Sequence, residues 1–245
     1  VYKRQGGIGQ VGDITNRFPV DSAYFDPVLW LNNKKTKFDG YCSDIFTNEA
    51  LKFIEKNQDR NFFCYLSFNA PHTPLQLPEK YNDFYKNVDS KILLESETKK
   101  MTKRDVNDAK KIYGMITNID DNIGKLVNKL EKLGISENTI LVFMTDNGPQ
   151  QIRYNSGLKG LKSDVYEGGI KVPFYLRYPK VFKKSFDFTP ISAHIDVLPT
   201  IAKLCGVELS NKLKIDGIDL FKKAKNYKIN ERSLFSYWTR KNTEW

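Results

Sequence analysis

Two oxygen-bearing side chains that follow a short apolar run are the first candidates for chemistry. Asp146 and Asn147 come directly after residues 140–144 and immediately before a glycine. Carboxylate and amide oxygens are the ligands that Ca²⁺ and Mg²⁺ prefer. Asn-Gly is also a common hairpin turn, although residues 149–151 do not begin an alternating strand. A metal or catalytic site and a plain turn therefore both remain open here.

A second candidate is His72, one of only two histidines in the chain. It lies in the segment Asn69–Pro74, where prolines on either side stiffen the loop. The loop follows another apolar run, residues 62–68. An isolated histidine is often structural, but a rigid polar loop at the end of a strand is also a common place for a functional residue.

A third candidate is the glycine-rich and charged stretch over residues 150–171, which carries Arg153, Lys159, Lys162 and Lys171. Closely spaced cations on a loop that can bend tightly favour an anion site. The alternative is that each cation belongs to a solvated surface. A glycine cluster at Gly6–Gly9 is weaker, and a flexible loop accounts for it.

Three elements are expected to position these groups. The apolar runs 62–68, 140–144 and 174–178 predict strands, and uninterrupted apolar runs are typical of a parallel sheet buried on both faces. Because ligands gather beyond the carboxyl ends of such strands, His72 and Asp146 are expected at one edge. The sequence therefore predicts an α/β fold with a mostly parallel sheet flanked by helices.

The clearest predicted helix runs from a Thr102–Asp105 capping start to Gly134. Its apolar residues form one stripe, typical of a helix lying on a sheet, and a short coiled coil is the alternative. The stripe consists of Ile112, Ile116, Ile119, Ile123, Leu126, Leu130 and Leu133. Shorter helices are predicted from Thr47 to Lys56 and over residues 195–204, a strand over 233–238, and loops over 1–40.

The composition is that of an ordinary globular protein of 245 residues with a formal charge of +10. We expect no membrane span, because no apolar run approaches the roughly 18 residues that one needs. We expect no nucleic-acid partner, because no motif of that kind is present, whereas a basic field would attract anionic substrates. The three cysteines form neither a metal-ligand pattern nor a disulfide framework.

Four segments, taken in order, resemble the type I, formylglycine-dependent sulfatases of the alkaline phosphatase superfamily. They are NAPHTPLQLPEKY, NIDDNIGKLVNKLEKLGISENTILVFMTDNGP, YNSGLKGLKSDVYEGGIKVPF and HIDVLPTIAKLCG. The earlier segments GGIGQ, YFDP and GYCSDIFTNEALKFIE are similar to the arylsulfatase-like branch. The resemblance implies the sulfatase fold, incomplete at both ends. It implies a partial catalytic domain over residues 1–208, and a connector with the start of a truncated subdomain over residues 209–245.

The resemblance also implies roles for four residues. Asp146 and Asn147 match two ligands of a Ca²⁺ ion, which is expected rather than Mg²⁺. His72 matches the histidine that contacts the sulfate ester or its leaving oxygen, and Lys162 matches the lysine that holds a sulfate oxygen. Leu161 and Ser163 flank this lysine where the family usually has glycines.

The nucleophile of the family is a formylglycine made from cysteine in a Cys-x-Pro/Ala-x-Arg motif. Neither Cys42, Cys64 nor Cys205 stands in such a motif. The chain therefore resembles a fragment that lacks the N-terminal region with the nucleophile, and we expect the fragment alone to be inactive. The implied parent is a periplasmic or secreted enzyme acting on a sulfated small molecule or polysaccharide.

Two alternative functions remain open at this stage. One is a phosphate or phosphonate ester hydrolase of the same superfamily, and the other is a non-catalytic module that binds sulfated glycans. The sequence specifies neither the oligomeric state nor the identity of the sulfated substrate.

Overall fold

The structure, a computed structural model, describes residues 2–3, 24–94, 101–221 and 232–238. The chain forms two compact units, Val1–Phe182 and Lys183–Trp245. The domain boundary predicted after residue 208 stays a prediction. The Gly6–Gly9 loop lies outside the described residues.

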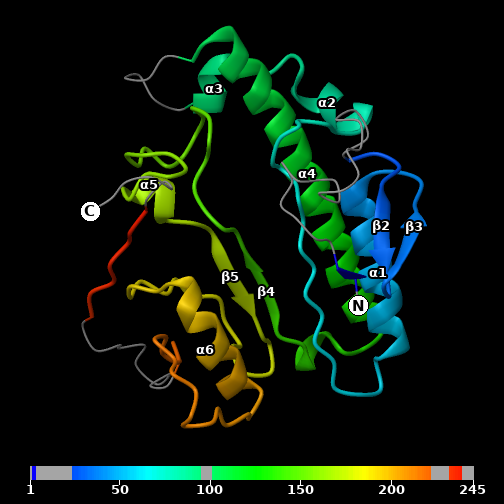
Figure 1. Ribbon diagram of the computed structural model, residues 1–245, viewed down its shortest axis with the longest axis vertical. Coiled ribbons are helices and arrows are strands. Elements are labelled where there is room, and N and C mark those ends of the chain that lie inside the picture. Colours follow the sequence, from blue (N-terminus) through cyan, green and yellow to red (C-terminus); the bar gives the residue numbers. More distant parts are fainter. Residues whose placement is uncertain (1, 4–23, 95–100, 222–231, 239–245) are drawn as a thin grey trace. The chain divides into compact units, whose positions relative to one another are not determined.

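The first unit is built around the long helix α4, Lys103–Lys132 (Figure 1). Its start is the predicted capping box: the backbone N–H of Asp105 donates to Thr102 Oγ1, and Thr102 N donates to the Asp105 carboxylate. Its end is also as predicted, because Gly134 adopts a φ of 69°, which favours glycine. Local signals therefore predicted both ends of this helix.

The buried face of α4 differs from the predicted apolar stripe. Met115 is fully buried, whereas Ile116 is 42% exposed. Asn118 and Asn122 are also buried, and both side-chain amides donate to Asp44 Oδ1, at 3.1 and 2.7 Å. A buried amide needs such a partner, and the partner comes from another helix, so the sequence pattern of α4 alone could not predict this burial.

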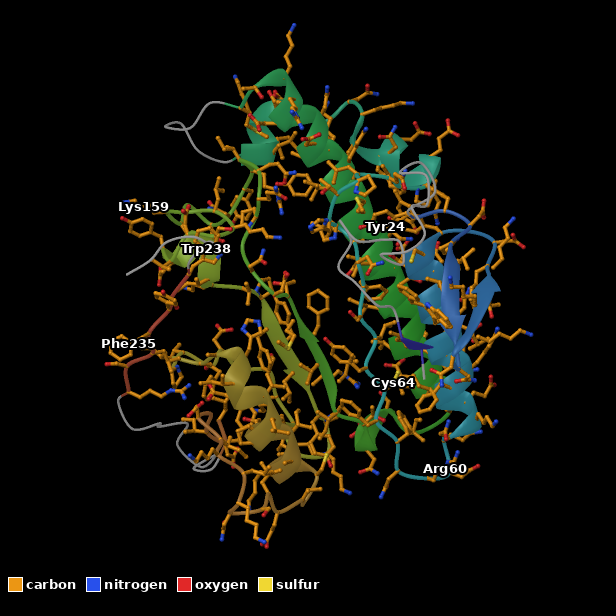
Figure 2. The ribbon with its side chains drawn as sticks, viewed as in Figure 1. Tyr24, Arg60, Cys64, Lys159, Phe235 and Trp238 are labelled. Carbon is orange, nitrogen blue, oxygen red and sulfur yellow. The ribbon has the colours of Figure 1, made fainter. Side chains whose placement is uncertain are left out.

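Helix α1, Cys42–Lys56, packs beside α4 and supplies Asp44. The predicted start of this helix at Thr47 was wrong, because Thr47 lies inside the helix and its hydroxyl donates to the carbonyl of Ser43 at 2.9 Å, whereas the predicted end at Lys56 is confirmed. The helix begins at Cys42, whose backbone N–H donates to the carbonyl of Tyr24 at 2.8 Å. Figure 2 shows Tyr24 near α4, where it belongs to a core cluster with Met115.

A small antiparallel sheet precedes α1, so the loop predicted over residues 1–40 was wrong in part. Strands β1 (Tyr2–Lys3), β2 (Val28–Leu31) and β3 (Lys34–Lys37) lie in this order. Asn32 and Asn33 join β2 to β3 with φ values of 48° and 68°. Asparagine is one of the few residues that tolerate this conformation, and two in succession are typical of a type I′ hairpin.

The apolar run over residues 62–68 is not a strand in the described structure, contrary to the prediction. Its side chains nevertheless alternate, because Phe62, Cys64 and Leu66 pack against a core cluster whereas Phe63 and Tyr65 are 79% and 82% exposed. This alternation is typical of strands. A strand also requires a hydrogen-bonded neighbour, which the segment lacks among the described residues.

The two other predicted strands are confirmed as β4, Leu141–Met144, and β5, Phe174–Arg177, which pair side by side (Figure 1). The described strand pairs are all antiparallel, where a mostly parallel sheet was predicted. The loop between β4 and β5 starts and finishes at the same end of this strand pair, since Gly148 N, just after β4, donates to the carbonyl of Gly169, just before β5, at 2.9 Å. Strand β5 therefore runs back along β4.

Two short helices cover α4. The Tyr81 hydroxyl of α2 (Glu79–Tyr85) donates to Asp121 of α4 at 2.8 Å. The carbonyl of Leu93 in α3 (Ser90–Leu94) accepts from the Tyr113 hydroxyl at 3.0 Å. A one-turn helix η3, Ser136–Asn138, leads from α4 into β4. Among the described helices, none has the length and apolarity needed to cross a bilayer.

The second unit contains the one-turn helix η4, His194–Asp196, which continues into α6, Val197–Leu204. This confirms the helix predicted over residues 195–204, and Gly206 follows it with a φ of 71°. The strand predicted over residues 233–238 is wrong, because that described segment has no regular structure.

The two glycines of α4 offer a matched test of its packing. We expect Gly124→Ala to raise the free energy of unfolding by about 0.5–1 kcal/mol, because nothing lies within 4 Å of the added Cβ. We expect Gly114→Ala to lower it, because its Cβ would come 2.8 Å from the carbonyl oxygen of Tyr81 and overlap Leu77. Urea denaturation of both variants checks this, and equal changes would contradict the packing of α2 on α4.

Candidate functional site

The turn that follows β4 is held by backbone contacts to a distant part of the chain. Gly148 N donates to the carbonyl of Gly169, and Lys162 N donates to the carbonyl of Pro149 at 2.8 Å. A Cβ on Gly148 would overlap the carbonyl oxygen of Gly168, so this close approach requires glycine. Asp146 and Asn147 are thereby positioned against the loop that carries Lys162.

The side chains of this turn are arranged to present oxygen atoms. Asn147 Nδ2 donates to the carbonyl of Gly148 at 2.8 Å, which leaves Asn147 Oδ1 as an acceptor. Asp146 Oδ1 accepts from Asn147 N at 2.9 Å, and its second carboxylate oxygen remains. These two oxygens fit a hard cation but provide only part of the six to eight ligands that Ca²⁺ takes. Within the described residues, no group of three or more His, Cys, Asp or Glu side chains could hold a metal.

Among the four cations of the loop, Lys162 differs from the other three. Lys159 lies over the Tyr166 ring, with Nζ 4.0 Å from the ring centroid, next to α5 (Glu167–Ile170; Figure 2). Lys171 Nζ lies 4.0 Å from Glu167, and Arg153 donates to Gln151 Oε1 at 3.2 Å.

The half-buried Lys162 side chain has no hydrogen-bond or ion-pair partner in the described part of the chain. The other three cations are already engaged by neighbouring side chains. The ammonium group of Lys162 is therefore available for an anionic ligand.

His72 is fixed on both its backbone and its ring. Its carbonyl accepts from the Tyr24 hydroxyl at 2.7 Å, and its Nδ1 lies 2.7 Å from the carbonyl oxygen of Thr73. A carbonyl oxygen only accepts, so Nδ1 carries the hydrogen in this contact. The other nitrogen, Nε2, is left to exchange a proton with a ligand.

The three candidate loops all contribute to the lining of one cavity of about 880 Å³. Its walls include Thr73, which follows His72, together with Gln150 and Leu161, which precedes Lys162. The predicted side chains His72, Asp146, Asn147 and Lys162 do not line this cavity themselves; their chain neighbours do. The structure therefore brings their loops to one region of the first unit, and their roles stay predictions.

Several residues around this cavity did not emerge from the sequence. Lys111, on α4, and Gln76 line the cavity with Gln150 and Gln151. Gln150 and Gln151 had a signal, because polar amides directly follow the Asp-Asn-Gly-Pro turn. Lys111 had none, because a chain with 39 lysines and arginines offers no way to single it out.

Comparison with known proteins gives a consistent result. A family model described as Sulfatase matches residues 3–207. The ulvan-active sulfatase of Formosa agariphila is 30% identical over 202 residues, which cover 80% of this chain and 38% of that protein. Human N-acetylglucosamine-6-sulfatase is 29% identical over 226 residues, which cover 82% of this chain and 40% of that protein.

The fold is similar to that of solved sulfatase structures. The crystal structure of Ps i-CgsB in complex with k-i-k-neocarrahexaose has a TM-score of 0.70 and 31% identity, covering 82% of this chain and 42% of that one. This similarity confirms the predicted α/β fold of the sulfatase type. The chain spans about two fifths of the length of the relatives that it matches, with 38% and 40% of two of them covered.

Proposed function

This chain belongs to the sulfatase family, and from that premise we propose that the complete protein hydrolyses sulfate esters at the region formed by the loops of His72, Asp146 and Lys162. The observation that supports the proposal most directly is the convergence of these loops. The Lys162 amide bonds to Pro149, and one cavity is walled by the chain neighbours of both His72 and Lys162.

The chemistry of the proposed site follows from its charges. A sulfate ester spreads negative charge over its oxygens, and that charge shifts toward the leaving oxygen as the S–O bond breaks. The free ammonium group of Lys162 would stabilise charge on a sulfate oxygen without rearranging. His72, with Nε2 unengaged, would give a proton to the leaving oxygen when its ring is protonated.

The family generally uses a metal ion and a formylglycine. Asp146 and Asn147 would provide two of the metal ligands, and Ca²⁺ is the ion we propose. A bound cation would supply a fixed positive charge that orients sulfate. The three cysteines are free thiols and none stands in a formylglycine motif, so we expect these 245 residues alone to show no turnover.

The relatives suggest the class of substrate. One is named an ulvan-active sulfatase, and one solved structure is a complex with k-i-k-neocarrahexaose. We therefore propose a sulfated polysaccharide as the substrate of the complete protein. A periplasmic or secreted location remains a prediction from the family resemblance.

Removal of the metal tests the proposed function. We expect the complete protein to release sulfate from 4-nitrophenyl sulfate and from carrageenan oligosaccharides. Chelation should lower this rate by about 100-fold or more, and Ca²⁺ should restore it, since a cation contributes several kcal/mol to stabilising such charge. Faster release of phosphate from 4-nitrophenyl phosphate would favour the phosphoesterase alternative, and glycan binding without sulfate release would favour a binding module.

A further inference from the structure

The side chains that line the cavity beside the proposed site carry balanced charges, unlike those of an anion site. Two cations line it, Arg104 and Lys111, together with two carboxylates, Asp105 and Asp108. Arg104 Nε lies 3.7 Å from the Asp108 carboxylate, so that pair largely cancels. The lining as a whole therefore carries no excess of positive charge with which to attract a second sulfate group.

Side-chain amides give the cavity its hydrogen-bonding capacity. Gln150 and Gln151 line it one after the other, directly after the turn that follows β4. An amide both donates and accepts, as a sugar hydroxyl does, so amides pair with hydroxyls in either direction. In the described part of the chain, neither the Gln150 side chain nor the Lys111 amine has a hydrogen-bond partner.

Arg153 fixes the direction of one of these amides. Its Nη1 donates to Gln151 Oε1 at 3.2 Å, which occupies the oxygen and leaves the Gln151 NH₂ group as a donor. Arg153 therefore acts as a positioning residue behind the cavity.

Apolar side chains complete the cavity and its size suits a sugar. Pro74, Leu75, Ile152 and Leu161 line it, and such surfaces pack against the C–H faces of sugar rings. Ligand sites typically enclose roughly 300–1,000 Å³, and this cavity of about 880 Å³ lies in that range.

We propose that this cavity is a subsite for an uncharged sugar unit next to the sulfated unit of the substrate, with Gln150, Gln151 and Lys111 bonding its hydroxyls. The position of the subsite rests on the proposed function, because Thr73 and Leu161 in its walls adjoin His72 and Lys162. The complete protein would then prefer substrates in which an uncharged sugar unit adjoins the sulfated sugar unit.

Binding measurements test the subsite separately from hydrolysis. The probes are neocarrahexaose and its fully desulfated form, titrated into the complete protein by calorimetry. We expect Gln151→Ala to weaken binding of both probes by the same factor, about tenfold for one lost hydrogen bond. Lys162→Ala should weaken only the sulfated probe. Gln58→Ala, in the turn after α1 and outside the cavity lining, is the matched control and should change neither.

Two outcomes would overturn the subsite. One is that the desulfated probe does not bind, and the other is that Gln151→Ala weakens only the sulfated probe, which would make the cavity an anion site. Sulfate release from 4-nitrophenyl sulfate in the same preparations reports on the proposed function. Binding of the desulfated probe without any sulfate release would disprove that function while supporting the subsite.

Discussion

Replacing Lys162 by alanine is expected to lower kcat/KM for sulfate ester hydrolysis by the complete protein by about 100- to 1,000-fold, the usual effect of removing one preorganised group that stabilises developing charge. The reason is structural. The amide of Lys162 is tied to Pro149 while its side chain has no partner among the described residues, so the charge is placed but not neutralised.

Lys159 provides the control, since it lies three residues away in the same loop. Its amine already lies over the Tyr166 ring. Lys159→Ala therefore removes a positive charge that is already engaged by a neighbouring side chain. We expect its kcat/KM to fall by no more than about threefold, in line with the small energy of an exposed cation–π contact. Steady-state kinetics on both variants decides the matter, and equal losses would show that the general positive charge of the loop is what counts.

A second large effect is expected in the other unit, where Asp196 and Arg232 form a buried ion pair. Asp196 is fully buried and accepts from Arg232 Nη1 at 2.9 Å, from Ala193 N at 2.8 Å and from Ile218 N at 2.9 Å. Arg232 also donates to the carbonyl of Ile191 at 2.8 Å. The pair therefore joins three separate parts of this unit, residues 191–196, Ile218 and Arg232.

We expect Arg232→Ala to lower the free energy of unfolding of this unit by about 3–5 kcal/mol, because it leaves a buried carboxylate without its counter-ion. Native-state hydrogen exchange of the α6 amides measures this loss. Lys52→Ala in the first unit, measured by exchange of the α1 amides, is the comparison, since Lys52 forms a 2.7 Å pair with Glu49 and its own side chain is 72% exposed. An exposed pair contributes about 0–1 kcal/mol, and similar losses in both variants would contradict the role of burial.

The same pair predicts sensitivity to acid. Burial raises the pKa of Asp196, but hydrogen bonds from Arg232, Ile218 and Ala193 outweigh it and hold the pKa below the ordinary value of 3.8. A carboxyl whose pKa is lower in the folded state stabilises the fold above its unfolded pKa and loses that contribution as the pH falls through the folded value. We expect the wild type to lose stability below about pH 3.8 more steeply than Arg232→Ala, as acid titration of unfolding would show.

Local sequence patterns correctly predict those features whose causes lie within a few residues. The capping box at Thr102, the stop at Gly134 and the strands β4 and β5 are confirmed, because caps, glycine conformations and apolar runs are local. The ordered motifs also indicate the family, and the family model over residues 3–207 agrees.

Local patterns do not predict which groups meet, because the partners come from distant parts of the chain. Asn118 is buried since α1 brings Asp44 to it, and residues 62–68 form no strand since no neighbour pairs with them among the described residues. The direction of β5 follows from the bond between Gly148 and Gly169. Likewise, residue type and spacing do not separate the four loop cations, and the family resemblance alone points to Lys162. In the structure the other three cations are engaged by neighbouring side chains, whereas the Lys162 side chain has no partner among the described residues.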